Sequence, residues 1–81
     1  MITVLFFAQV RELAGVDRLT VDSVYGTVEA LRLALCDRGD RWSRALEPDT
    51  LLAAVNQALV SRDHPLAPGD EVAFFPPVTG G

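Results

Sequence analysis

The sequence predicts a single α+β domain in which one main helix packs on one face of a mixed sheet. Five short segments rich in β-branched and aromatic residues favour strands, and a stretch with apolar residues at helical spacing separates the second from the third. The chain has 81 residues, of which 49% are hydrophobic, so it can enclose the core of one domain. The strand segments are 2–8, 19–21, 51–55, 58–60 and 71–75.

The first strand, residues 2–8, predicts which side chains face the core. Successive side chains of a strand point to opposite faces of the sheet. Ile2, Val4 and Phe6 therefore share one uniformly apolar face, which we expect to be buried. Phe7 points to the other face, where a large aromatic side chain is unusual for an isolated domain.

A short helical turn connects the first strand to the second. We expect residues 9–15 to form this turn and Gly15 to end it, because glycine readily adopts the left-handed conformation that closes a helix. Residues 19–21 then form the second strand, after a connection that reverses the chain as a hairpin does.

The main helix begins after Thr27, whose hydroxyl is suited to cap the first turn. Apolar residues recur at helical spacing from Val28 to Leu35, which predicts an amphipathic helix of about three turns. We expect Gly39 to end this helix. Residues 40–47 then form a second, shorter helical piece.

The second half of the chain predicts the rest of the sheet. A two-residue turn at positions 56–57 joins the strands 51–55 and 58–60, because asparagine tolerates a positive φ. Residues 71–75 form the last strand. The order is therefore strand, strand, helix and three strands, which is typical of the β-grasp (ubiquitin-like) fold. We expect residues 1–75 to form this domain.

Residues 76–81 follow the last strand as a flexible C-terminal tail. Pro76 and Pro77 lack the N–H that a sheet ladder needs, so the last strand ends before them. An extended segment of this length reaches roughly 20 Å. It ends in Gly80-Gly81, which have no Cβ and can enter a narrow channel.

The composition excludes several classes of function. The formal net charge is −4 and the pI is near 4.6, which argues against nucleic acid or an anionic membrane as the partner. The longest apolar runs are far shorter than the ~20 residues that span a bilayer. A single cysteine excludes an internal disulfide framework and indicates a reducing compartment, so we expect a cytoplasmic protein.

Side chains suited to catalysis are scarce. His64 is the only histidine and precedes a proline, which indicates a role in a turn. Cys36 flanks the apolar helix stripe with no adjacent basic residue to lower its pKa. The acidic residues are scattered, so we expect no metal site. The group that remains is the terminal carboxylate of Gly81, which is inert until a partner enzyme activates it, for example by adenylation with ATP.

Four blocks of the sequence resemble the MoaD family, the small sulfur-carrying subunits of molybdopterin synthase. The final block, Gly69 to Gly81, is the most specific, since it contains the Phe-Phe-Pro-Pro-Val-Thr-Gly-Gly end. The family often has glycine after the hairpin asparagine, where this chain has Gln57. The other three blocks are 6–15, 52–57 and 63–66.

The resemblance implies a function. An E1-like enzyme would use ATP to adenylate Gly81, and sulfur from a cysteine desulfurase would convert the terminus to a thiocarboxylate. The tail (Pro76, Pro77, Val78, Thr79 and Gly80) would insert into the large subunit of a heterotetramer of two small and two large subunits. There the thiocarboxylate would donate sulfur to cyclic pyranopterin monophosphate. The chain would therefore be the small subunit of a sulfurtransferase and would not be catalytic alone. It would bind no cofactor itself.

A partner surface is also expected. Alternation places Phe7 and Phe75 on the face of the sheet opposite the core, and the first and last strands are neighbours in a β-grasp sheet. The resemblance adds Leu59 to this surface. An exposed aromatic pair is typical of a docking site.

Three alternative functions stay open on the residues alone. The chain could be a ThiS-type sulfur carrier for thiazole synthesis, a ubiquitin-like modifier joined to lysines, or an interaction module whose tail has no role. The phenylalanine and proline residues before the terminus favour the molybdopterin interpretation.

Overall fold

The fold is seen in a computed structural model that describes residues 1–77. The predicted roles of Val78, Thr79, Gly80 and Gly81 lie outside the described residues. The elements are β1 (Ile2–Phe6), α1 (Ala8–Ala14), β2 (Arg18–Val21), α2 (Val28–Cys36), α3 (Asp40–Ala45), the 3₁₀ helix η1 (Pro48–Thr50), β3 (Leu52–Val55), β4 (Ala58–Val60) and β5 (Glu71–Phe75).

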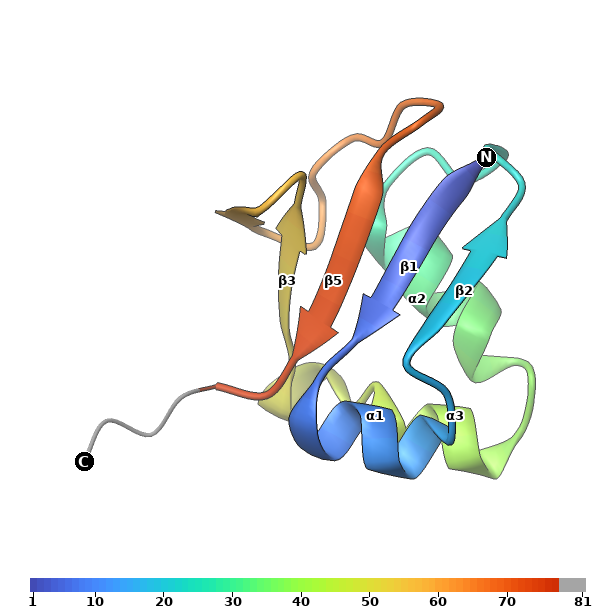
Figure 1. The fold of residues 1–81 in the computed structure, drawn as a ribbon, viewed down its shortest axis with the longest axis vertical. Helices are drawn as coiled ribbons and strands as arrows, with labels where there is room; N and C mark the ends of the chain where they lie inside the picture. The colour runs from blue at the N-terminus through green and yellow to red at the C-terminus, as the bar shows by residue number, and fades with distance from the viewer. Residues whose placement is uncertain (78–81) are drawn as a thin grey trace.

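The strands of residues 1–77 form one five-stranded sheet in the order β2-β1-β5-β3-β4. β1 and β5 are parallel, and the other neighbouring pairs are antiparallel, so the predicted mixed sheet with adjacent first and last strands is confirmed. Figure 1 shows that β1 and β5 run side by side and end at the same edge of the molecule, where α1 begins and the chain leaves β5.

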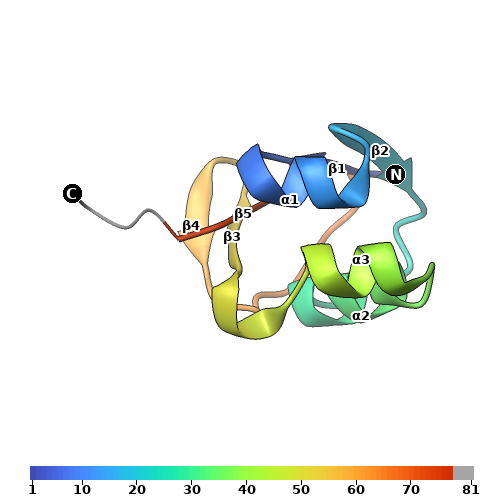
Figure 2. The ribbon, with the colours of Figure 1, turned by 90° about the horizontal axis from the view of Figure 1, so that it is seen from below.

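The core lies between one face of this sheet and the helices. Val4, Phe6, Val72 and Phe74 are at most 1% exposed, and the intervening residues of β1 and β5 are half-buried, as strand alternation predicts. The apolar side of α2 packs against them. Figure 2 shows α2 and α3 on the same side of the sheet, with α1 across its end.

Two predicted helix signals are confirmed and one is wrong. The hydroxyl of Thr27 accepts a hydrogen bond from the N–H of Ala30 at 3.1 Å, and Gly15 ends α1 in the left-handed conformation with φ 83°. Gly39, however, does not end α2, which finishes at Cys36. The N–H of Gly39 bonds back to the carbonyl of Cys36 at 3.3 Å, so the last turn satisfies this carbonyl and Gly39 instead precedes α3.

The predicted two-residue turn between β3 and β4 is confirmed. Asn56 and Gln57 have φ values of 51° and 71°, and positive φ at both positions defines a type I′ hairpin turn. The side-chain amide of Asn56 donates to Asp70 at 3.0 Å, and its oxygen accepts from the N–H of Glu71 at 3.1 Å. These bonds attach the hairpin that carries β4 to the start of β5.

Candidate functional site

The outer face of the sheet, opposite α2, presents one residue from each strand in a continuous row. The register pairs each of these residues with its neighbour in the next strand. From one edge of the sheet to the other they are Arg18, Leu5, Ala73, Ala54 and Leu59. The row is therefore apolar apart from the arginine at the β2 edge.

A second row lies closer to the end where the chain leaves the sheet. Phe75 is paired with Leu52, and both are half-buried. Phe7 follows the last residue of β1 in an extended conformation, and its N–H donates to the carbonyl of Phe74 at 3.2 Å. The parallel register therefore continues one step beyond β1 and sets Phe7 level with Phe75.

The large apolar side chains of the two rows form an outer apolar patch, consisting of Leu5, Phe7, Leu52, Leu59 and Phe75. Phe7 is 47% exposed and Leu59 is 68% exposed, which is unusual for large apolar side chains in water. The sequence-predicted face of Phe7 and Phe75 is confirmed. Leu59, expected from the family resemblance, lies on the same face.

The patch is confined to one half of the outer face. On the other side of the central row the register aligns Thr20, Thr3 and Glu71, which are polar. The apolar half is the half from which β5 continues into Pro76 and Pro77 (Figure 1). A protein that bound the patch would therefore lie next to the start of the C-terminal segment.

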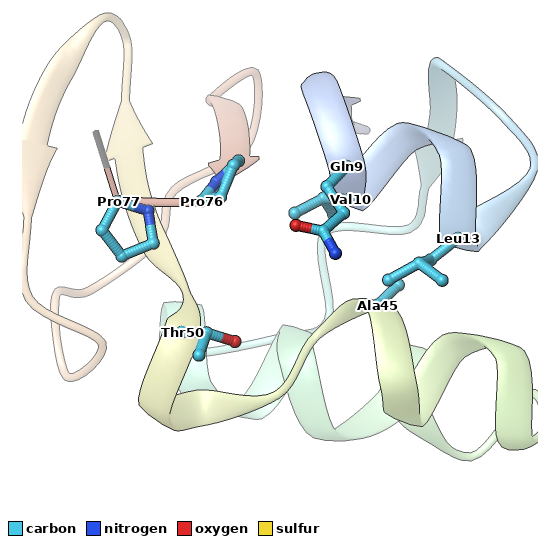
Figure 3. A pocket seen from close by; sticks show the side chains of 7 residues that line it. All are labelled: Gln9, Val10, Leu13, Ala45, Thr50, Pro76 and Pro77. Carbon is cyan, nitrogen blue, oxygen red and sulfur yellow. The ribbon is translucent and has the colours of Figure 1, made fainter. Parts of the chain in front are cut away.

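The first two residues of the C-terminal segment line a groove of about 410 Å³. Figure 3 shows Pro76 and Pro77 on one side of it and the side chains of α1 on the other. The lining residues are Gln9, Val10, Leu13, Ala45, Thr50, Pro76 and Pro77. The segment thus starts across the groove from α1, and Thr50 of η1 lines the same groove. Its remaining predicted site residues, Val78, Thr79, Gly80 and Gly81, lie beyond the described part of the chain.

The side chains with potential reactivity do not form a catalytic group. The guanidinium of Arg32 lies 3.8 Å from the sulfur of Cys36, yet burial raises the pKa of the Cys36 thiol, so the thiolate is disfavoured. The backbone of His64 accepts a hydrogen bond from Val28 and donates one to Ser61, which fits its predicted role in a turn. Within residues 1–77, no cluster of three or more histidine, cysteine or acidic side chains could hold a metal ion.

One feature that the sequence did not predict is the buried guanidinium of Arg32. It donates two hydrogen bonds to the carboxylate of Glu29, at 2.7 and 2.6 Å, and one to the carbonyl of Leu46 at 2.9 Å. The hydrogen bonds lower the pKa of Glu29 and raise that of Arg32. The three-residue spacing of Glu29 and Arg32 on a helix is typical of an ion pair. Nothing in the sequence indicates the hydrogen bond between Arg32 and the carbonyl of Leu46. This arginine joins α2 to the end of α3 and has no contact with the patch.

No helix among the described residues is long and apolar enough to cross a membrane.

The fold and the site define the class of the protein. A β-grasp domain with an apolar outer face beside the start of its C-terminal segment has the architecture of ubiquitin-like proteins. Comparison with known proteins narrows the class. A model described as "ThiS family" matches residues 4–81. The chain is 67% identical to the molybdopterin synthase sulfur carrier subunit of Escherichia coli and 52% identical to that of Haemophilus influenzae, each over the full length of both chains.

The chain belongs to the ThiS family and, within it, to the molybdopterin synthase sulfur carrier subunits. This confirms the resemblance and favours molybdopterin over the thiazole alternative.

Solved structures agree with the fold. A putative molybdopterin converting factor subunit 1 from Pyrococcus furiosus is 32% identical, with a TM-score of 0.73, and the match covers 95% of this chain and 97% of that one. SAMP1 from Haloferax volcanii is 30% identical, with a TM-score of 0.71, and the match covers 99% and 98%.

Proposed function

We propose that this chain carries sulfur as a thiocarboxylate on Gly81 and donates it to cyclic pyranopterin monophosphate, as part of a sulfurtransferase complex. The observation that supports this most strongly is the full-length identity of 67% to a molybdopterin synthase sulfur carrier subunit. The geometry supports it too, because the outer apolar patch adjoins the segment that leads to Gly81. The chain supplies the carried group, and its partners supply activation and substrate binding.

The chemistry needs an activated terminus. The carboxylate of Gly81 attacks the α-phosphorus of ATP on an E1-like enzyme and releases pyrophosphate, which gives an acyl adenylate. A persulfide that a desulfurase forms from cysteine then displaces AMP and gives an acyl disulfide. A thiol reductant cleaves its S–S bond, which leaves the thiocarboxylate on the chain and a disulfide on the donor side. All seven basic residues of the chain are arginine, so no lysine amine competes as an internal nucleophile. The raised pKa of Cys36 likewise disfavours internal capture.

The large subunit of the synthase is the proposed partner of the outer apolar patch. Two small and two large subunits would form a heterotetramer. Phe7, Leu59 and Phe75 would contact the large subunit, and residues 76–81 would enter its active site. Pro76 and Pro77 restrict the backbone at the base of this segment, which lowers the entropy lost on insertion. Aromatic side chains in a buried interface frequently dominate the affinity.

The test is the intact mass of the chain purified from sulfur-replete cells. A fraction of the protein should carry one oxygen-to-sulfur exchange, located in the C-terminal fragment. The same chain from cells without the adenylating enzyme is the matched control and should lack the shifted species.

A ubiquitin-like modifier is the second candidate, because the similar Haloferax volcanii protein belongs to a group described as small archaeal modifier proteins. If the chain were found only as lysine-linked adducts on other proteins, without the sulfur-shifted species, the modifier function would replace the carrier function.

A further inference from the structure

A small hollow adjoins the outer apolar patch at the β2 edge of the sheet. It measures about 310 Å³ and lies where β1 ends and α1 begins. The hollow is lined by Leu5, Phe6, Phe7, Arg11, Asp17 and Arg18. Two of these residues, Leu5 and Phe7, belong to the outer apolar patch, so the hollow is continuous with it.

The backbone determines why two arginines line this hollow. Arg18 is paired with Leu5 in the antiparallel register, so its side chain stands on the outer face at the end of the central row. The N–H of Arg11 donates to the carbonyl of Phe7 at 3.3 Å, which places Arg11 one helical turn after Phe7. The carbonyl of Asp17 accepts a hydrogen bond from the N–H of Phe6 at 3.0 Å and holds the β2 end of the loop in place.

The hollow carries a local positive charge in an acidic protein. Arg11 and Arg18 are both exposed, and within residues 1–77 the only ion pair closer than 4.0 Å is that of Arg32 with Glu29. Two arginines therefore line the hollow with a single acidic residue, Asp17, in a chain of net charge −4. A protein that covered the adjacent patch would bring its own side chains against these guanidinium groups.

We propose that the hollow receives a carboxylate side chain of the synthase large subunit, which pairs with Arg11 and Arg18 at the rim of the interface around the outer apolar patch. The inference rests on the proposed function, since it assigns the same partner to this face. Guanidinium groups bind carboxylates with two parallel hydrogen bonds and prefer this pairing at interfaces. A charged rim around an apolar centre is the usual anatomy of such an interface. Complementary charges at the rim also increase the rate of association more than they increase the affinity.

The affinity for the large subunit, measured at several salt concentrations, tests whether the charges of Arg11 and Arg18 contribute to the complex. Arg11→Gln and Arg18→Gln should each weaken the complex about two- to fivefold, mainly through slower association, and should reduce its salt dependence. Arg44→Gln is the matched control, because Arg44 is an exposed arginine of α3 that lines neither the hollow nor the groove. This control should leave the affinity and its salt dependence unchanged.

A crosslink tests the contact directly. The chain contains no lysine, so Arg18→Lys introduces a single side-chain amine while it keeps the charge. A zero-length carbodiimide should then join this amine to an aspartate or glutamate of the large subunit, identified by peptide mass spectrometry. Arg44→Lys in the same complex should give no such product.

The outcomes distinguish the two claims. If Phe75→Ala weakens the complex but both glutamine variants bind like the wild type with unchanged salt dependence, the proposed carboxylate contact is wrong and the proposed function stands. If the crosslink forms at Arg44→Lys and not at Arg18→Lys, the contact is likewise wrong. If the arginine variants impair only adenylation, the hollow belongs to the activating enzyme. If the wild-type chain does not bind the large subunit, the proposed function fails and the contact with it.

Discussion

Replacing Phe75 by alanine separates the role of this side chain in the fold from its role in binding. Phe75 is half-buried on the outer face, whereas the adjacent Phe74 is fully buried in the core. A fully buried phenylalanine costs about 3–5 kcal/mol of stability when truncated to alanine. The half-buried ring of Phe75 should therefore cost about 1–2 kcal/mol, which lowers Tm by roughly 4–16 °C in a domain of this size.

The loss of affinity for the large subunit should be larger. An aromatic anchor in a desolvated interface contributes 2 kcal/mol or more on truncation, and this corresponds to an affinity at least about thirtyfold weaker. Urea unfolding measures the loss of stability, and titration of the folded variant with the large subunit measures the loss of affinity. Binding is measured well below the Tm of the variant, so that only folded protein is compared.

Two variants serve as controls for this measurement. Leu33 is 53% exposed on α2, away from the patch, so Leu33→Ala should change neither stability nor affinity appreciably. Phe74→Ala should lose about 3–5 kcal/mol of stability. If Phe75→Ala behaves like Phe74→Ala in unfolding and keeps its affinity within about threefold, the outer apolar patch is part of the core and the docking argument is refuted.

Three further predictions concern the terminus, the hairpin and the buried ion pair. Deleting Gly81 should abolish conversion of the pterin precursor, because the reactive carboxylate retracts by about 3.3 Å and a misplacement of even 1 Å can cost about 10²-fold in rate. The free energy of unfolding should stay within about 0.5 kcal/mol of the wild-type value and co-elution with the large subunit should persist. Full sulfur transfer by the truncated chain would contradict the carrier mechanism. Gln57→Gly should raise the free energy of unfolding by up to about 1 kcal/mol, because the φ of 71° is unfavourable for a residue with a Cβ, and a loss in urea unfolding would contradict this turn geometry. Glu29 has a pKa below its ordinary value of 4.5 because of its hydrogen bonds to Arg32, so its ionisation stabilises the fold above pH 4.5 and this contribution is lost as the pH falls through the lowered pKa. Unfolding followed against pH should therefore show a shallower acid loss in Glu29→Gln than in the wild type, and equal slopes would contradict the assignment.

Local signals predicted the features that depend on neighbouring residues. The opposite faces of Phe6 and Phe7 follow from the two-residue period of a strand, and the cap at Thr27 follows from a hydroxyl three residues before a free N–H. The turn at Asn56 follows from the tolerance of asparagine for positive φ. Each of these depends on interactions within a few residues, so the chain specifies them without a partner segment.

One wrong prediction and one feature that was not predicted depend on segments farther away or on competing hydrogen bonds. Gly39 was expected to end α2, but the last carbonyls of the helix are satisfied by a tightened turn, and the glycine is needed at the start of α3. The burial of Arg32 depends on the carbonyl of Leu46, which reaches it only when α3 folds back on α2. Neither outcome is visible in the local pattern.

The sequence by itself determined the class of fold, the face of each strand residue and the diglycine terminus that carries the family resemblance. Only the tertiary structure decided which of these residues become neighbours. Phe7 and Phe75 lie level because β1 and β5 pair in one parallel register, and Arg18 joins the same face because β2 pairs with β1 at Leu5. A register is chosen by burying the whole apolar face at once, since a shift of one residue would turn every side chain to the wrong side. That choice involves segments from both ends of the chain, so no short stretch of sequence contains it.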